Sequence, residues 1–230
     1  MCGRVNVSDL EGLDELIASI AERPCEPEAH ARVSRWNVAP SRVLDVVTTD
    51  SATADPATVS MQWGIDAPWS NQQDSYARPL INARSESVFD KPSFSQHARA
   101  RRCILPINGF YEWQRSAKQR NAFYIHPRQG PGLLVAGIWA EPDDKAQALP
   151  SLCLLTRAAE EHISEIHDRM PMMLAPDAAR QWIQDDNTCQ QLLEQPSVIE
   201  LAVTRVGDFV NNAGNEGPEC VAPPRNLSLF

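Results

Sequence analysis

Alternating or continuous apolar runs, bounded by turn residues, recur along most of the chain. They predict strands at 42–49, 57–64, 103–107, 109–115, 121–127, 133–141, 151–157 and 199–206. Segment 166–174 is expected to pass from a loop into a strand. An apolar spacing typical of helices occurs instead at 8–24, 93–103, 160–166 and 175–184.

The clearest helical segment is SDLEGLDELIASIAERP, at 8–24. Ser8 and Glu11 form a capping-box pattern at its start, and Pro24 ends it. Its apolar stripe consists of Leu10, Leu13, Leu16, Ile17 and Ile20. Ser93 is expected to cap the helix at 93–103, and Pro176 suits the first turn of the helix at 175–184.

The remaining stretches are a polar loop at 69–79 and an irregular tail at 211–226. The sequence has no repeat, long linker or low-complexity segment. The 18 prolines are spread along the chain and indicate many turns. A chain of 230 residues can bury a sizeable core, so we predict one mixed α/β domain over residues 1–230.

Charge narrows the choice of partners. The formal net charge is −9, which disfavours non-specific attraction to nucleic acid as the main role of the surface. A local basic patch remains compatible with it, because salt screens charges beyond about 8 Å. The sequence contains no signal peptide or membrane-spanning run, so we expect a cytoplasmic protein, nucleoid-associated when on DNA.

The six cysteines are widely spaced and include no CxxC pair. Cys103 and Cys153 lie within apolar runs and are expected to be buried thiols. This usage is typical of a reducing compartment and disfavours a disulfide framework. No metal is expected, because Cys and His pairs with zinc-ligand spacing are missing.

The chain begins MCGR, and this end is the first stretch with candidate chemistry. We expect Met1 to be removed because the next side chain is small. Cys2 would then carry an α-amine and a thiol, and roughly a fifth to a third of the amine is neutral at about pH 7.4. Such a pair can condense with an aldehyde to an imine and close to a thiazolidine, or attack an amide. A cysteine without function is the alternative, which Gly3 disfavours by allowing close backbone approach.

Three further stretches hold polar groups that a plain fold would not need. In INGFYEW, strand alternation places Glu112 on the face of Phe110 and opposite to Tyr111 and Trp113. Aromatic neighbours should desolvate this carboxylate, raise its pKa and make it a candidate acid or base. A strand-end glutamate facing water is the alternative.

The stretches EIHDRMP and INARSES offer a proton carrier and anion ligands. His167 can exchange protons near neutrality, and Arg169 can hold a phosphate or carboxylate in a fork. Alternation places Asn82, Arg84 and Glu86 on one side, where Asn and Arg suit an oxyanion or phosphate. A solvated helix end and a polar strand edge are the respective alternatives.

Taken together, these stretches resemble the SRAP family of SOS-response-associated peptidases, which includes abasic-site processing proteins. The matching motifs are MCGR, WNVAPS, QWGIDAPW, INARSES, LPINGFYEW, LLTRAA and IHDRMPMML, in family order over about residues 1–175. The tail VNNAGNEGPEC fits more loosely. The resemblance implies the SRAP-type fold, a mixed, mostly antiparallel β-sheet core with flanking helices, and no cofactor.

The resemblance also implies the activity. The terminal cysteine of the family crosslinks to abasic sites in single-stranded DNA, so Cys2 corresponds to the covalent nucleophile. Asn82, Glu112 and His167 match the other active-site positions. The family is further credited with autoproteolysis that exposes the cysteine, which we expect to be idle here because only Met1 precedes Cys2.

The resemblance implies a set of DNA contacts as well. They are expected at Arg4, Asn37, Pro40, Trp69, Arg84 and Arg169. Trp69 corresponds to an aromatic wedge at the lesion, and Arg99, Arg101 and Arg102 are additional candidates. The expected partners are single-stranded DNA containing abasic sites and the replication-fork machinery, with the protein acting as a monomer and without membrane contact.

Two other classes of protein could begin in a similar way. N-terminal-nucleophile glutamine amidotransferases also start with Met-Cys-Gly, but they carry an early Asn-His pair, and no Asn-His dipeptide occurs here. A non-catalytic DNA reader would keep Arg84, Arg169 and Trp69 without needing Glu112 or a free Cys2.

Overall fold

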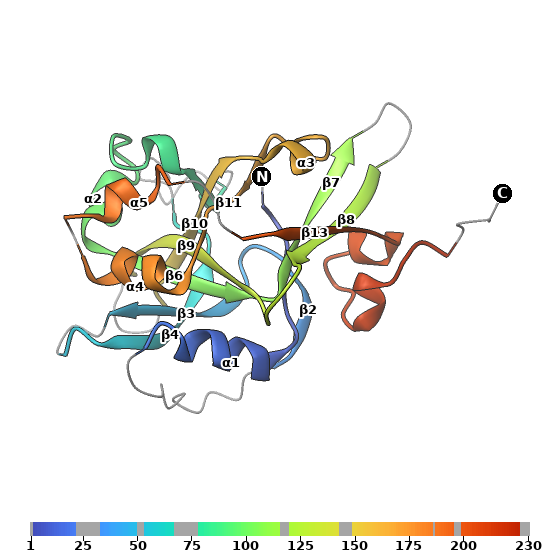
Figure 1. Ribbon diagram of the computed structural model, residues 1–230, viewed down its shortest axis with the longest axis horizontal. Coiled ribbons are helices and arrows are strands. Elements are labelled where there is room, and N and C mark those ends of the chain that lie inside the picture. The colour runs from blue at the N-terminus through green and yellow to red at the C-terminus, as the bar shows by residue number, and fades with distance from the viewer. Residues whose placement is uncertain are drawn as a thin grey trace.

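The structure of the protein is a computed structural model. It describes residues 2–21, 33–49, 53–66, 78–115, 120–142, 149–185, 187–195 and 199–225. Two β-sheets form its centre, and helices lie around them (Figure 1). In the described residues, no helix is long and apolar enough to cross a membrane.

The first sheet has five strands in the order β13-β8-β7-β1-β2. Every neighbouring pair in it is antiparallel. Its strands are β1 (Val5–Val7), β2 (Arg35–Val38), β7 (Gly109–Arg115), β8 (Arg120–Pro127) and β13 (Leu201–Val206). The first strand of the chain is thus enclosed between β7 and β2, which brings the N-terminal end into the sheet.

The second sheet has eight strands along the path β11-β10-β4-β3-β6-β9-β12, with β5 beside β10. Its strands are β3 (Val43–Thr49), β4 (Pro56–Trp63), β5 (Asn82–Arg84), β6 (Arg102–Ile107), β9 (Leu133–Ala140), β10 (Ser151–Ala158), β11 (Arg169–Pro171) and β12 (Met173–Leu174). Because β9 also pairs with β10, the path β10-β4-β3-β6-β9 closes on itself. Only β10–β4 and β10–β5 are parallel among the described pairs. The prediction of a mixed α/β fold with a mostly antiparallel core is confirmed.

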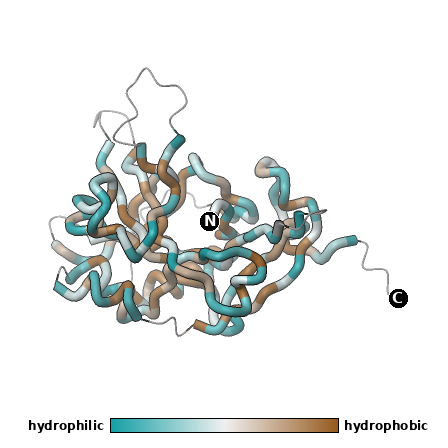
Figure 2. The backbone as a smooth tube through the Cα atoms, turned by 90° about the horizontal axis from the view of Figure 1, so that it is seen from above, coloured by the Kyte–Doolittle hydropathy of each residue, from teal (hydrophilic) through white to brown (hydrophobic). Residues whose placement is uncertain are grey.

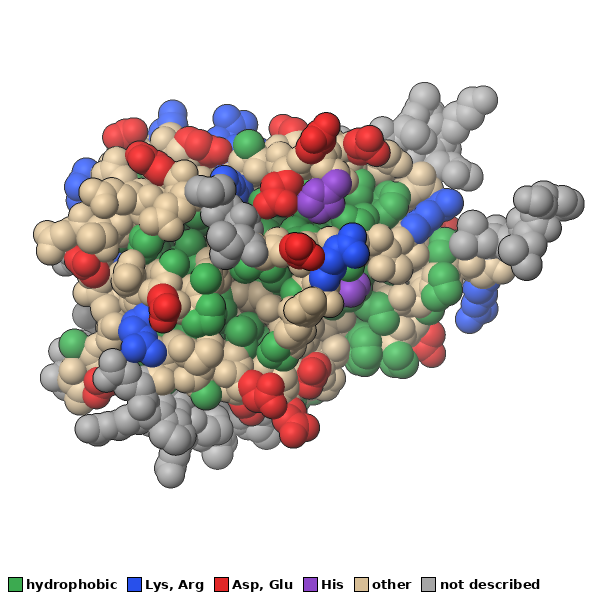
Figure 3. All heavy atoms as spheres, viewed as in Figure 1, with side chains coloured by type: hydrophobic (Ala, Val, Ile, Leu, Met, Phe, Trp, Pro, Cys, Tyr) green, Lys and Arg blue, Asp and Glu red, His purple; other side chains and the backbone are tan. Residues whose placement is uncertain are grey.

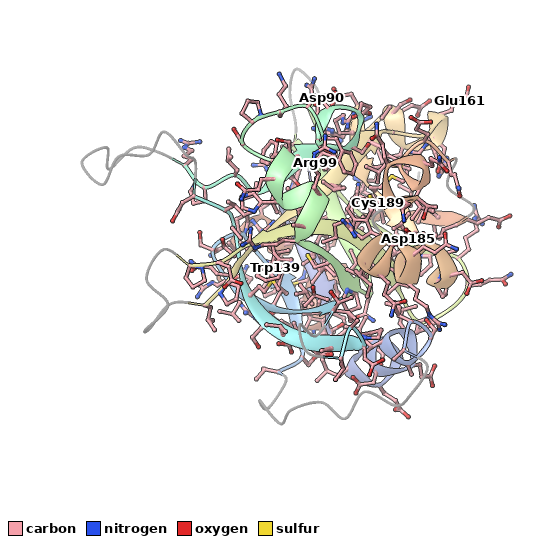
Figure 4. The ribbon with its side chains drawn as sticks, turned by 90° about the vertical axis from the view of Figure 1, so that its left-hand side faces the viewer. Asp90, Arg99, Trp139, Glu161, Asp185 and Cys189 are labelled. Atoms are coloured by element: carbon pink, nitrogen blue, oxygen red, sulfur yellow. The ribbon has the colours of Figure 1, made fainter. Side chains whose placement is uncertain are left out.

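The helices are short and lie outside the sheets. They are α1 (Leu10–Ala18), α2 (Ser95–Ala100), α3 (Glu161–Ser164), α4 (Pro176–Gln184) and α5 (Cys189–Leu192), with 3₁₀ turns at η1 (Ser85–Ser87), η2 (Asp208–Asn211) and η3 (Pro218–Val221). Figure 4 shows α2, marked by Arg99, and the α4–α5 pair, marked by Asp185 and Cys189, on one side of the molecule. Pro176 begins α4 as predicted.

Three apolar clusters stabilise this arrangement. The first lies between the sheets and joins residues such as Phe110 and Ile125 of one sheet to Leu105 and Leu154 of the other. The second joins the opposite face of β6, β9 and β10 to α4 and α5 through side chains such as Trp182. The third packs Tyr111 under η2 and η3. Apolar segments run through the middle of the molecule, with the N-terminal end among them (Figure 2).

Two predicted helix caps are wrong. Asp9, not Ser8, caps α1 by accepting the Gly12 N–H at 3.1 Å. The Ser8 hydroxyl instead donates to Asn6 Oδ1 at 2.7 Å. The cap position of α2 is Phe94, which makes no side-chain capping bond, so Ser93 does not cap this helix.

Arg102, an additional candidate for DNA contact, is a core residue with 5 % exposure. Its guanidinium donates to the carbonyls of Trp182, Ala98 and Arg99 and lies over the Trp182 ring. These bonds satisfy a buried cation internally. The expectation that Arg102 contributes a surface cation is therefore wrong.

Candidate functional site

Cys2 lies at the end of the strand that the first sheet encloses. β1 runs antiparallel to β7, with Val5 opposite Phe110, so the residues before β1 run along β7 toward its later residues. Cys2 has 0 % exposure and belongs to the cluster between the sheets. Its carbonyl accepts a hydrogen bond of 2.7 Å from Asn82 Nδ2. The N-terminal cysteine is therefore held at a defined place and is not part of a frayed end.

Asn82 is positioned by the second sheet. It is the first residue of β5, which runs parallel to β10 with Asn82 opposite Leu154. While its amide nitrogen binds Cys2, its Oδ1 is buried and has no hydrogen-bond partner among the described residues. Since a buried acceptor without a partner costs free energy, Asn82 has a hydrogen-bonding capacity that a ligand or a new terminal amine can use.

Glu112 follows the alternation that the sequence predicts for β7. Phe110 contacts the cluster of Cys2, whereas Tyr111 and Trp113 belong to the cluster on the other face. Glu112 has 3 % exposure, and this burial raises the pKa of its carboxyl group. Burial also raises the pKa of the Cys2 thiol, and the negative charge of Glu112 raises it further. The predicted desolvation of Glu112 is confirmed, and the two groups interact electrostatically.

His167 approaches the same place from the segment between α3 and β11. Its backbone N–H donates to the Ile163 carbonyl at 3.1 Å, which continues the turn of α3. A positive charge on its ring lowers the pKa of Glu112, against the larger effect of burial. The ring nitrogen Nδ1 lies 3.0 Å from the Arg169 backbone N–H and 3.0 Å from Asp168 Oδ1. Hydrogen bonding and electrostatics thus link Cys2, Asn82, Glu112 and His167.

The predicted phosphate ligand Arg169 has an internal partner. Its guanidinium donates to both carboxylate oxygens of Glu86 at 2.6 and 2.7 Å. These bonds lower the pKa of Glu86 to about 2. The Arg169 side chain is 12 % exposed, and it also donates to the Thr156 carbonyl at 2.5 Å. The sequence placed Glu86 beside Asn82 and Arg84, but nothing in it indicated this ion pair with Arg169.

Arg4 and Asn37 are joined to each other. Arg4 Nη1 donates to Asn37 Oδ1 at 2.6 Å and to the Val210 carbonyl at 3.0 Å. Asn37 is 1 % exposed. Its Nδ2 donates to backbone carbonyls of the η2–η3 segment and so holds that segment against β2. Burial, followed by the nearby Arg120 charge, lowers the pKa of Arg4. The predicted DNA contact at Asn37 remains a prediction, and here its side chain has structural partners.

The other predicted DNA contacts have different surroundings. Pro40 is half-buried in the turn after β2, and Arg84 is exposed at the end of β5. Trp69 lies outside the described residues. Sequence reasoning did not foresee that Trp113 lies beneath the guanidinium groups of Arg4 and Arg120, at 5.5 and 4.8 Å from its ring centre. The Arg120 contact joins different strands, so no local pattern indicates it.

A metal centre finds no support in the part of the chain that the structure describes, since no cluster of three or more His, Cys, Asp or Glu side chains occurs there. The described cysteines are all free thiols. The predicted burial of Cys103 and Cys153 is confirmed, with 0 % exposure for both. The groups linked to Cys2 among the described residues are thus its own thiol, a buried carboxyl group, an imidazole and an amide.

Comparison with known proteins identifies relatives of this chain. The chain is 30% identical over 236 residues to abasic site processing protein YedK of Escherichia coli (strain K12), covering 97% of this chain and 100% of that protein. It is 28% identical to abasic site processing protein YoqW of Bacillus subtilis (strain 168), covering 96% and 99%. Abasic site processing protein HMCES of Xenopus tropicalis is 28% identical, but the match covers 75% of this chain and 59% of that protein.

The fold has solved relatives too. A crystal structure of a protein from Bacteroides thetaiotaomicron superposes with a TM-score of 0.77 at 19% identity, covering 96% of this chain and 99% of that one. The family model described as SOS response associated peptidase (SRAP) matches residues 1–213. The chain therefore belongs to the SRAP family.

Proposed function

We propose that this protein processes abasic sites in single-stranded DNA by forming a covalent thiazolidine through Cys2 once Met1 has been removed. The similarity to proteins named for abasic site processing supports the substrate class. The observation that carries the chemical proposal is the bond from Asn82 to the Cys2 carbonyl beside buried Glu112. This contact gives the terminal amine and thiol a fixed position next to a proton carrier.

The proposed reaction forms two bonds and releases one water. An abasic sugar opens to an aldehyde at C1′, and the neutral Cys2 amine adds to that carbon. The carbonyl oxygen leaves as water, giving an imine. The Cys2 sulfur then adds to the same carbon, and its proton ends on the nitrogen, closing a five-membered thiazolidine. No atom changes its oxidation state overall, so the reaction needs no redox partner.

The neighbouring residues supply proton transfer and orientation. Glu112, whose pKa burial raises, can donate a proton to the departing oxygen and accept one from the thiol. Because the pKa of the buried thiol is also raised, the amine is the group that reacts first. His167 would protonate the ring oxygen and assist opening or reversal. Asn82 would use its unpartnered Oδ1 on the amine or the sugar.

The DNA would lie over the Cys2 end of the molecule. On the face shown in Figure 3, apolar side chains lie across the middle with a few acidic, basic and histidine side chains among them, and further charged ones lie toward the edge. Such a surface suits stacked bases and a few phosphates, and stacking contributes about 1–3 kcal/mol per base. Arg4 and Arg84 are the proposed phosphate contacts, Pro40 and Trp69 the proposed apolar ones. The net charge of −9 favours lesion capture over the coating of intact DNA.

The proposal extends to the domain organisation, oligomeric state, location and partners of the protein. We expect one SRAP domain over residues 1–230, acting as a monomer in the cytoplasm and at the nucleoid, with the replication-fork machinery as neighbour. Peptidase-type self-processing would use the Cys2 thiol on the preceding amide. Mass spectrometry tests whether this self-processing occurs, on wild-type protein and Cys2→Ser expressed without methionine aminopeptidase activity. If self-processing is idle, both proteins should retain Met1.

A denaturing gel tests the crosslink. Wild-type protein lacking Met1 is mixed with a single-stranded oligonucleotide that carries one abasic site, with and without borohydride. We expect a stable shifted band without reductant. Cys2→Ser retains the amine but not the thiol, so its band should require borohydride, which traps the imine. Protein retaining Met1 should give no stable band without borohydride, because its terminal amine and the Cys2 thiol are on different residues.

Two variants complete the design. Cys189→Ala, in the helical layer marked in Figure 4, removes a buried thiol away from Cys2 and should keep the stable band. Glu112→Gln should slow crosslinking well below the wild-type rate. A reductant-independent band from Cys2→Ser, or no band from the wild type, would show that Cys2 does not form the proposed adduct.

A further inference from the structure

Three segments meet at the guanidinium group of Arg169. Its Nη1 and Nη2 donate to the two oxygens of Glu86 in η1, and Nη2 also donates to the Thr156 carbonyl of β10. Arg169 itself begins β11, where its backbone is paired with Ala158. A two-pronged bond of this kind fixes the orientation as well as the distance of a guanidinium. The side chain therefore ties the start of β11 to η1 and β10.

The backbone of the same residue fixes the imidazole of His167. The Arg169 N–H donates to His167 Nδ1 at 3.0 Å. A nitrogen that accepts a hydrogen bond carries no proton, so neutral His167 has its proton on Nε2. Asp168 Oδ1 also lies 3.0 Å from Nδ1, where it would favour a proton on that nitrogen. Nδ1 has both neighbours at 3.0 Å, so the tautomer depends on the balance between them, and that balance depends on where the Arg169 backbone is held.

We propose that Glu86 is a positioning residue for His167, acting through Arg169. The carboxylate holds the guanidinium, the guanidinium holds the start of β11, and the Arg169 N–H then keeps His167 in the tautomer with the proton on Nε2. This inference rests on the proposed function, in which His167 delivers a proton to the sugar. Glu86 itself touches neither Cys2 nor His167 in the described contacts.

An alternative role of the Glu86–Arg169 ion pair is competition, in which Glu86 and a DNA phosphate compete for the Arg169 guanidinium. If Arg169 were a phosphate ligand in the bound state, Glu86 would occupy its fork until DNA displaced it. The observed contacts favour positioning, because the Arg169 side chain is only 12 % exposed and a third bond to Thr156 anchors it inside. The two roles differ in what removal of the Glu86 charge does to DNA affinity.

The test uses Glu86→Gln, with Glu86→Asp as the conservative variant. Crosslinking rates are measured at saturating abasic-site DNA with Met1 removed. Binding constants and their salt dependence are measured on the same variants retaining Met1, which cannot form the adduct. Nitrogen-15 spectra of histidine-labelled protein, assigned with a His167→Gln variant, report the tautomer of His167 independently of activity. Asp185→Asn is the control, because this carboxylate accepts its bonds from the nearby Asn187 N–H and Thr188 hydroxyl.

We expect Glu86→Gln to crosslink about tenfold more slowly with an unchanged binding constant, an effect of the size seen when the outer partner of a metal-bound histidine is removed. Its His167 spectrum should show a proton partly on Nδ1, and Glu86→Asp should restore most of the rate. Tighter DNA binding at the wild-type rate would overturn the inference in favour of competition. An unchanged His167 spectrum would also overturn it, even in a protein that never crosslinks.

Should Glu86→Gln fail to fold, Glu86→Asp and Arg169→Lys carry the same test. Arg169→Lys keeps a cation but loses the fork, so we expect the altered His167 spectrum and the slower rate. A loss of DNA affinity with a shallower salt dependence in this variant would instead identify Arg169 as a phosphate ligand. A wild-type protein without crosslinking would count against the proposed function and leave the spectral prediction to be judged separately.

Discussion

The side chain of Asn37 offers the sharpest test of how the Cys2 end is supported. Its Oδ1 accepts from Arg4 at 2.6 Å, and its Nδ2 lies within 3.3, 2.9 and 3.0 Å of the carbonyls of Val210, Asn212 and Asn215. Asn37→Ala removes all of these contacts at a position with 1 % exposure. The perturbation therefore separates β2 from the η2–η3 segment and frees Arg4 from one partner.

The expected cost follows from the number of bonds. Nδ2 has two hydrogens for three carbonyls, so we count two neutral bonds at about 1 kcal/mol each and one bond to a charged group at about 2 kcal/mol. Arg4 keeps its bond to the Val210 carbonyl, which reduces the last contribution. The net loss is about 3 kcal/mol, equivalent to a decrease in Tm of roughly 6–12 °C for a chain of this size.

Thermal and urea unfolding, followed by circular dichroism, measure this loss. Asn121→Ala is the matched control, since Asn121 accepts one exposed bond from Arg205 at 2.9 Å. Its Tm should change by less than about 2 °C. Asn37→Asp, which places a charge opposite the carbonyls, should destabilise at least as much as Asn37→Ala. If Asn37→Ala unfolds like the wild type but binds single-stranded DNA more weakly, the support role is refuted and Asn37 is a DNA ligand.

Three further outcomes are expected. The pKa of Glu86, near 4.5 when unfolded and about 2 when folded, makes the group stabilising above about pH 4.5, and this contribution disappears as the pH falls toward 2. Because the side chain is half exposed, the stability difference between wild type and Glu86→Gln in urea should be only about 1 kcal/mol at neutral pH and should shrink in acid. Folding raises the pKa of Glu112, so its contribution to stability decreases as the pH rises above 4.5, the ordinary value of the group. Glu112→Gln should therefore lose less stability than the wild type over this rise in pH, and equal losses would contradict this. Gly132→Ala would place a Cβ 2.3 Å from the Ile107 carbonyl oxygen and should lower the free energy of unfolding in urea by at least about 2 kcal/mol. Gly214→Ala is the control, because the atom nearest its Cβ lies at 3.4 Å, and its stability should not change. Equal urea midpoints for the two variants would exclude the clash.

Local periodicity accounts for much of what the sequence predicts. A period of two in β7 correctly separates Phe110 and Glu112 from Tyr111, because strand geometry alone decides which side chains share a face. The apolar runs of β6, β9 and β10 are also recognisable, because strands buried on both faces need apolar residues at nearly every position. Motif order then identifies the family.

Most features that the sequence does not predict depend on contacts between distant segments. Ser8 and Asp9 are both capable caps for α1. Ser8 bonds to Asn6, whereas the backbone N–H of Asp9 donates to Asn108 Oδ1, 99 positions away. The cationic run before β6 suggests a surface, but the carbonyl of Trp182, eighty positions away, accepts a buried bond from Arg102. The ion pair of Arg169 with Glu86 spans 83 positions and has no local signal.

The enclosed position of β1 has a consequence for the order of events during synthesis. Cys2 cannot reach its buried site until β7 exists, which requires about the first 115 residues to leave the ribosome. At roughly 5–20 residues per second this takes roughly 6–23 s. Once it has left the ribosome, the start of the chain is exposed to an aminopeptidase for the rest of that interval, although Cys2 is fully buried in the folded protein. The proposed removal of Met1 therefore has several seconds in which to occur before Cys2 becomes buried.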